Sequence, residues 1–130
     1  MTDVHDLRAE LAGLALLEGR TPKTSASEKA RSIVRIAPYR DGAIFLAKFS
    51  GTSNWERHPQ GDEIVQVVEG ETTLHLITPE GPRSFTLTAG MLVVVPRNAW
   101  HKFESEKGVS VMTATPQPTE HVDVADPRTL

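Results

Sequence analysis

The chain has 130 residues, with 14 Lys and Arg against 17 Asp and Glu, so its formal net charge is −3. This length fits one domain, and the lack of a basic surplus argues against nucleic acid as a partner. The sequence contains no cysteine, which excludes disulfides, thiolate metal sites and cysteine nucleophiles.

Membrane insertion and export are also disfavoured. The longest apolar stretches, residues 14–17 and 91–95, are far too short to cross a bilayer. The N-terminus carries Asp3, Asp6 and Glu10 where a signal peptide needs Lys or Arg. We therefore expect a cytoplasmic protein that does not bind a membrane.

Residues 1–32 are expected to hold a helix and a linker. Asp3 is a suitable N-cap and Gly19 a suitable stop. Between them, apolar residues recur at steps of three and four on one face: Val4, Leu7, Leu11, Leu14 and Leu17. This face packs either on the outside of the fold or against a second copy of the chain. The polar residues 20–32 predict an exposed connection.

From residue 33 the pattern changes to short strands separated by turn residues. Strands are predicted at 33–37, 43–50, 55–58, 63–69, 71–78, 83–88, 91–95, 99–104 and 109–115. So many short strands without intervening helices favour an all-β sandwich or barrel over residues 33–116. Residues 117–130 form a tail with few apolar side chains, expected to wrap the surface or to be mobile.

Two segments carry the chemistry-bearing residues. The first contains Glu56, His58 and Glu63, and the second, residues 90–103, contains His101. Because side chains alternate along a strand, Glu56 and His58 share a face. Imidazole and carboxylate donors inside an apolar barrel suit a divalent transition metal such as Fe, Mn, Zn or Ni.

We therefore predict a metal site made by His58, Glu63 and His101. Glu56 is either a fourth ligand or a residue of the rim. The alternative is a metal-free site in which the buried histidines and the carboxylate hydrogen-bond one another, since a buried charge needs a partner.

Other notable side chains are expected to lie outside this site. His5, His75 and His121 are predicted to be solvated at the surface. Trp55 and Trp100 each precede a site residue, so alternation directs them away from the cavity, against the N-terminal segment or a second subunit. The predicted barrel lining is aliphatic or aromatic: Val65, Val67, Leu74, Leu76, Val93, Val95, Phe103 and Val111.

The two segments resemble the paired motifs of the cupin superfamily. In the second motif, Gly90, Pro96 and His101 have the family spacing. Asn98 stands where the family usually has Gly, a mild change because Asn also tolerates positive φ. Ser105 replaces the terminal Asn of that motif.

The first cupin motif is less well preserved. Glu63 and Gly70 match it, but the His-x-His pair of the family falls on Glu56 and His58, so one imidazole is replaced by a carboxylate. The alternative register places the pair on Arg57 and Pro59, and both ligands are then lost.

The resemblance covers roughly residues 40–116 and implies a double-stranded β-helix, or jelly roll, that holds a small molecule. This superfamily includes dioxygenases, isomerases, decarboxylases, sugar epimerases, storage proteins and sensors. A metal-dependent enzyme, a non-catalytic sensory module and an eroded site therefore all stay open, and no catalytic residue is assigned. We expect a homodimer, which would cover the helix face and the unpaired strand edges.

Overall fold

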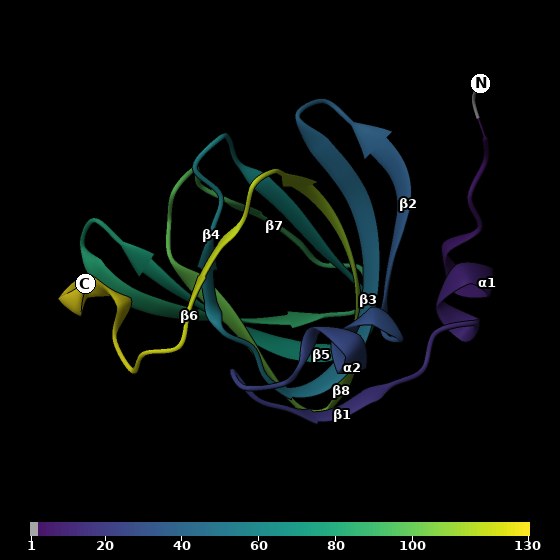
Figure 1. Cartoon of the computed structure of the whole chain (residues 1–130), viewed down its shortest axis with the longest axis horizontal. Helices are drawn as coiled ribbons and strands as arrows, with labels where there is room; N and C mark the ends of the chain where they lie inside the picture. Colours follow the sequence, from purple (N-terminus) through teal and green to yellow (C-terminus); the bar gives the residue numbers. More distant parts are fainter. Residues whose placement is uncertain (1–2) are drawn as a thin grey trace.

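The structure is a computed structural model that describes residues 3–130, and its strands curl into a barrel (Figure 1). Within these residues, nine strands and three short helices follow one another. Their order is α1 (Leu7–Ala12), β1 (Leu17–Arg20), α2 (Ala26–Ala30), β2 (Ile33–Tyr39), β3 (Gly42–Thr52), β4 (Trp55–Arg57), β5 (Glu63–Thr78), β6 (Gly81–Thr88), β7 (Leu92–Val95), β8 (His101–Pro116), β9 (Glu120–Val122) and the 3-10 helix η1 (Pro127–Thr129). The predicted all-β jelly roll with an N-terminal helix is confirmed.

The two longest strands, β5 and β8, organise the barrel. They pair with each other in antiparallel fashion, and β5 also pairs with β6 and β7. On its other side β8 pairs with β3, which continues to β2 and, in parallel orientation, to β1. The short strand β4 joins β8 to β9. Non-local pairing therefore holds the fold together, and α1 lies on the outside of the barrel (Figure 1).

The N-terminal helix is shorter than predicted. Its N-cap is Asp6 rather than Asp3, and the Asp6 side chain accepts a hydrogen bond from the backbone N–H of Ala9. The helix ends at Gly13, so Leu17 instead begins β1, where it pairs with Phe49. Tertiary pairing with β3 overrides the helical period at this point.

The apolar face of α1 is buried against the same chain at one residue, Leu11. Leu11 is buried, and α1 packs against β3. Val4, by contrast, is exposed and lies before the helix. The predicted exposed linker also contains α2, which begins with a capping box between Ser25 and Glu28.

Two glycines that were predicted to separate strands instead bend continuous ones. Gly70 has φ 82° within β5, and Gly108 has φ 124° within β8. A Cβ atom on Gly70 would lie 2.3 Å from the carbonyl oxygen of Gly108. Glycine is therefore needed where the two strands cross closely, and four predicted strands merge into two.

The tail wraps the surface, which was one of the two predicted alternatives. Its strand β9 pairs with β4, with Glu56 opposite His121. The indole N–H of Trp55 donates to the carbonyl oxygen of Ala125 at 3.3 Å. Trp55 thus packs against the C-terminal segment, which was neither of the two predicted partners, the N-terminal segment or a second subunit.

The hydrophobic core fills the barrel between β5, β8 and their neighbours. Seven of the eight predicted lining residues are buried, and Val93 is partly buried against the same cluster. Across residues 3–130 the helices are all too short and too polar to cross a lipid bilayer.

Candidate metal centre

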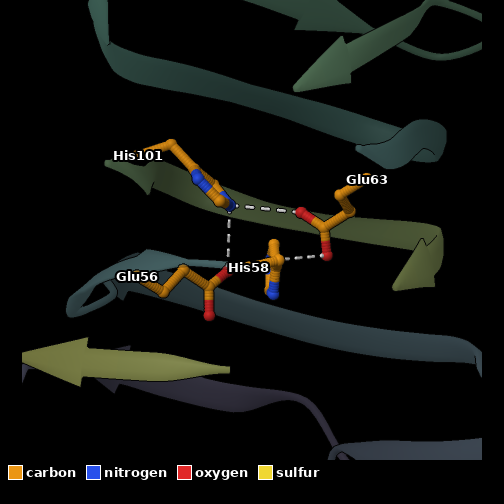
Figure 2. A group of neighbouring side chains, drawn as sticks. All are labelled: Glu56, His58, Glu63 and His101. Carbon is orange, nitrogen blue, oxygen red and sulfur yellow. Dashed lines mark hydrogen bonds and ion pairs between the residues drawn. The ribbon is translucent and has the colours of Figure 1, made fainter. Parts of the chain in front are cut away.

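Four titratable side chains converge inside the barrel (Figure 2). Glu56 lies in β4, His58 follows that strand directly, and Glu63 and His101 are the first residues of β5 and β8. The pairing of β4 with β8 sets Glu56 opposite His101. Each residue offers one ligand atom, and these four atoms lie within 4.8 Å of one another. The structure thus brings together all four residues that the sequence singled out.

The ring of His101 is fully buried and is held at both nitrogens. Its Nδ1 lies 2.9 Å from the carbonyl oxygen of Ala99, so the N–H at this position donates to the backbone. Its Nε2 lies 3.1 Å from Oε1 of Glu63 and 3.4 Å from Oε1 of Glu56. Histidines that bind metals are oriented in this way, with a backbone acceptor at one nitrogen and the other directed at the ion.

Glu63 is oriented by hydroxyl groups of β8. The Thr115 hydroxyl donates to Oε2 of Glu63 at 2.6 Å, and the hydroxyls of Thr113 and Thr115 are 2.8 Å apart. Hydrogen bonds of this kind fix the rotamer of a carboxylate ligand.

His58 supplies the test of whether these residues fit a metal ion. Its Nδ1 lies 2.9 Å from the hydroxyl oxygen of Thr119. Its Nε2 lies 3.3 Å from Oε2 of Glu63, yet within the described chain it has no hydrogen-bond partner of suitable geometry. A buried polar atom without a partner is costly. Because this nitrogen points into a cluster of metal-ligand atoms, the four residues fit a divalent transition metal ion.

The tail adds a residue that was predicted to be solvated. The Nε2 of His121 lies 3.3 Å from Oε2 of Glu56, although the His121 side chain is 45% exposed. Glu56 therefore lies between His101 on its buried side and His121 on its outer side. His121 is exposed, as predicted, but the pairing of β9 with β4 also brings it into contact with the site, which was not predicted.

The acids and imidazoles of this cluster shift one another's pKa values. Burial by itself lowers the pKa of His101, but hydrogen bonds to Glu56 and Glu63 outweigh this and raise it to about 10. Burial by itself raises the pKa of both carboxyl groups, yet hydrogen bonds from His101, joined by His121 at Glu56 and His58 at Glu63, bring each below its ordinary value. In the metal-free protein His101 is therefore protonated at neutral pH, and a metal ion must displace that proton.

The cluster opens into a cavity of about 520 Å³, a volume within the range of small-molecule sites. Glu56, His58 and Glu63 line one part of it. The larger apolar side chains of the remaining wall come from β2, β3 and β8: Ile33, Phe45, Ala47, Phe49, Phe103 and Val111. Residues of β1, α2 and the tail complete it.

Residues 45–114, which make up more than half of the chain, match the sequence profile of the cupin domain family. The chain belongs to the cupin family. In this cupin, the departure from the usual Gly at Asn98 is accommodated, since Asn98 adopts φ 63°. Its backbone N–H donates to the carbonyl oxygen of His58 at 3.0 Å, so this turn also anchors one histidine of the cluster.

Comparison with known proteins agrees with this assignment. The uncharacterized protein YdbB of Bacillus subtilis is 31% identical over 70 residues, which are 54% of this cupin and 59% of YdbB. This cupin thus matches less than two thirds of that relative's length. Protein NMB1881 from Neisseria meningitidis has a similar structure, with 25% identity, a TM-score of 0.59 and coverage of 92% of this chain and all of that one. A cupin-2 domain protein from Shewanella frigidimarina has 28% identity and a TM-score of 0.52, covering 70% and 80% of the two chains.

Sequence reasoning missed much of the cavity lining, including four polar residues close to the cluster or reaching the cavity from outside the matched domain. Thr115 had a signal, because it shares the strand face of Val111. Thr119 and His121 come from the tail, and Arg20 comes from the predicted linker. No local pattern marks these three, since only the pairing of β9 with β4 and of β1 with β3 brings them to the site.

Proposed function

We propose that this cupin binds one divalent transition metal ion, Fe, Mn, Zn or Ni, and holds a small molecule in the adjoining cavity. His58, His101, Glu63 and Glu56 would be its ligands. The observation that carries the proposal is the buried Nε2 of His58, which has no hydrogen-bond partner in the described chain and faces three other ligand atoms. When bound, such an ion supplies a Lewis acid beside the cavity.

The chain's own residues would prepare this site for a ligand. The carbonyl of Ala99 and the hydroxyl of Thr115 hold His101 and Glu63 in place. The largely apolar wall beside them offers a surface against which an apolar ligand could pack. These features are compatible with a metal-dependent enzyme of dioxygenase-like or isomerase-like type, with Glu56 as the fourth ligand or a general base.

The second candidate is a non-catalytic small-molecule-binding or sensory cupin with a degenerate site. One observation favours it: His101 Nε2 reaches both Glu56 and Glu63 directly, so these three residues satisfy one another without an ion. Turnover separates the two candidates, because a sensor changes its oligomeric state or partner binding with ligand and converts nothing.

The metal content of the purified, untagged protein tests the proposal. Mass spectrometry should find about one metal ion per chain in the wild type and none in the Glu63→Ala/His101→Ala double variant. The matched control is His75→Ala/Glu104→Ala, which removes a similar ion pair from the surface and should keep the metal. Absence of metal from the wild type, even after Fe, Mn, Zn and Ni are added, would overturn the metal site.

We also propose that the protein forms a homodimer. Within residues 3–130, β7 pairs with β5 alone and so presents a free strand edge. Leu92 and Val94 of β7 are about half exposed, and an exposed apolar edge strand favours association. Val94→Lys should convert a dimer to a monomer in sedimentation equilibrium, whereas Val4→Lys, at another exposed apolar residue, should not. A monomeric wild type at micromolar concentration would contradict this proposal.

The cytoplasmic location and the lack of nucleic-acid partners stay predictions from composition.

A further inference from the structure

Arg20 reaches the cavity from outside the matched cupin domain. It is the last residue of β1 and pairs with Gly51 of β3. Gly51 has φ 97°, and a Cβ atom at this position would lie 2.2 Å from the carbonyl oxygen of Arg20. Only glycine lets β1 approach β3 so closely, and this approach brings the Arg20 side chain to the cavity wall.

The guanidinium of Arg20 is partly buried, and no carboxylate within residues 3–130 forms an ion pair with it. Its Cζ lies 5.1 Å from the centroid of the Phe49 ring. Its Nε is buried and, among residues 3–130, has neither a hydrogen-bond partner nor a carboxylate oxygen within 4.0 Å. Burial lowers the pKa of Arg20 and attraction to Glu56 raises it. A buried polar atom on a cation ordinarily has a partner.

The charges around the cavity define the partner that would satisfy it. Lys29 and Arg35 also line the cavity, while its only acidic residues are Glu56 and Glu63 of the metal centre. Away from that centre the wall therefore offers three cations, a large apolar surface and four other polar side chains: Thr113, Gln117, Thr119 and His121. A ligand that suits this wall carries a negative charge on an apolar body.

We propose that Arg20 binds the carboxylate of a small organic acid whose apolar body lies along the wall formed by Phe45, Phe49 and Phe103. The planar guanidinium matches a carboxylate with two parallel hydrogen bonds. A phosphate shares this oxyanion chemistry, but its charge of about −1.5 to −2 would face the ionised Glu56 and Glu63. The single charge of a carboxylate is therefore favoured. The inference rests on the proposed role of the cavity as a small-molecule site and does not require the metal.

Binding measurements with three probes test this assignment. Isothermal titration calorimetry would compare benzoate, the neutral benzamide and phenylphosphonate on the full-length protein, both metal-loaded and treated with a chelator. We expect the wild type to bind benzoate more tightly than either other probe. Arg20→Gln should weaken benzoate binding by about tenfold or more, the usual value of a charge-assisted hydrogen-bond pair, and leave benzamide unchanged.

Two further variants keep the test specific. Arg31→Gln removes the same charge from an exposed position that does not line this cavity, and its benzoate affinity should equal that of the wild type. Arg20→Lys should recover part of the lost affinity, because it restores the charge without the planar fork. Circular dichroism should show that the fold of each variant is intact.

The proposal is overturned if the wild type and Arg20→Gln bind benzoate with equal affinity, or if the wild type shows no saturable benzoate binding. It is also overturned if Arg31→Gln loses as much benzoate affinity as Arg20→Gln does. Tighter binding of phenylphosphonate than of benzoate would overturn the choice of a carboxylate. Metal content, measured on the same samples, keeps the two proposals separate. A metal-free chain that binds benzoate through Arg20 refutes only the metal site, and a metal-loaded chain that binds no carboxylate refutes only this inference.

Discussion

Two histidines, His101 and His75, lie on neighbouring rungs of the β5–β8 ladder, and each pairs with a glutamate on the opposite face from the other. Where β5 pairs with β8, Leu76 is opposite His101, and the adjacent His75 is opposite Lys102. His101 points into the barrel toward Glu63. His75 points outward, where its Nδ1 lies 2.8 Å from the Ser84 hydroxyl oxygen and its Nε2 lies 2.9 Å from Oε1 of Glu104.

The two pairs have almost the same length and very different surroundings. The His101–Glu63 distance is 3.1 Å with side chains 0% and 4% exposed, and the His75–Glu104 distance is 2.9 Å with side chains 27% and 56% exposed. An exposed pair is screened by water and contributes about 0–1 kcal/mol. In a buried cluster, loss of one partner leaves a charge that water cannot reach. Burial therefore decides which pair is suited to a metal and which only ties strands together.

The largest effect on this comparison should come from His101→Ala. In the metal-free protein the variant leaves Glu56 and Glu63 buried without their cationic partner, so the free energy of unfolding should fall by about 3–5 kcal/mol. Urea denaturation in the presence of a chelator measures this change. A loss below about 1 kcal/mol would mean that the buried pair behaves like an exposed one.

The second-largest difference between the buried and the exposed pair should be in their effect on metal affinity. Glu56→Gln keeps the side-chain shape but removes the charge that faces His101, and should lower metal affinity by about 10- to 100-fold. Its counterpart at the surface, Glu104→Gln, should leave the affinity unchanged. Competition against a chelating dye gives both values, and equal affinities would remove Glu56 from the metal centre.

The pH dependence of stability should be a property of the buried cluster. The pKa of His101 is raised from 6.5 to about 10, so its contribution is fully present below pH 6.5 and is lost as the pH rises through about 10. The lowered pKa values of Glu56 and Glu63 add stability that is lost as the pH falls below their ordinary value of 4.5.

The metal-free protein should therefore be most stable between about pH 4.5 and 6.5. From there to pH 10 it should lose more than about 1.4 kcal/mol, the value of one pKa unit. Thermal denaturation with a chelator, repeated across this range, measures the profile. His75→Ala should keep the alkaline decline and His101→Ala should abolish it; a decline of equal size in both variants would assign it to other groups.

The smallest effect should come from His75→Ala. The variant removes contacts to Ser84 and Glu104 on the outer face, and the free energy of unfolding should change by less than about 1 kcal/mol. The metal content should stay at the wild-type level. A loss of several kcal/mol would show that this outer cluster contributes as much as the buried one.

Much of the candidate site followed from the sequence because it depends on local rules. Alternation along a strand directed Glu56 and His58 to one face, and the cupin spacing identified Glu63 and His101. The positive φ tolerated by Asn98 was also predictable, since that property belongs to the residue type.

Predictions failed where a contact with a distant segment outweighed the local pattern. The helical period through Leu17 gave way to pairing with Phe49. Gly70 and Gly108 are of a residue type that is common in turns. Each nevertheless lies within a strand, Gly70 in β5 and Gly108 in β8, because these two strands cross close to each other there. Whether a glycine ends a strand or bends it depends on which backbone packs against it, and here that backbone comes from a distant part of the sequence.

The sequence by itself determined the fold class, the family and four side chains of the candidate metal centre, because strand alternation and motif spacing are properties of neighbouring residues. Only the tertiary structure decided which residues of the N-terminal segment and the tail complete the wall of the cavity. Arg20 arrives through the pairing of β1 with β3, and Thr119 and His121 arrive with the tail that joins β4. These contacts link segments about 30 to 60 residues apart. The backbone hydrogen bonds that form them are available to nearly every residue type, so the sequence contains no pattern that identifies the side chains they bring together.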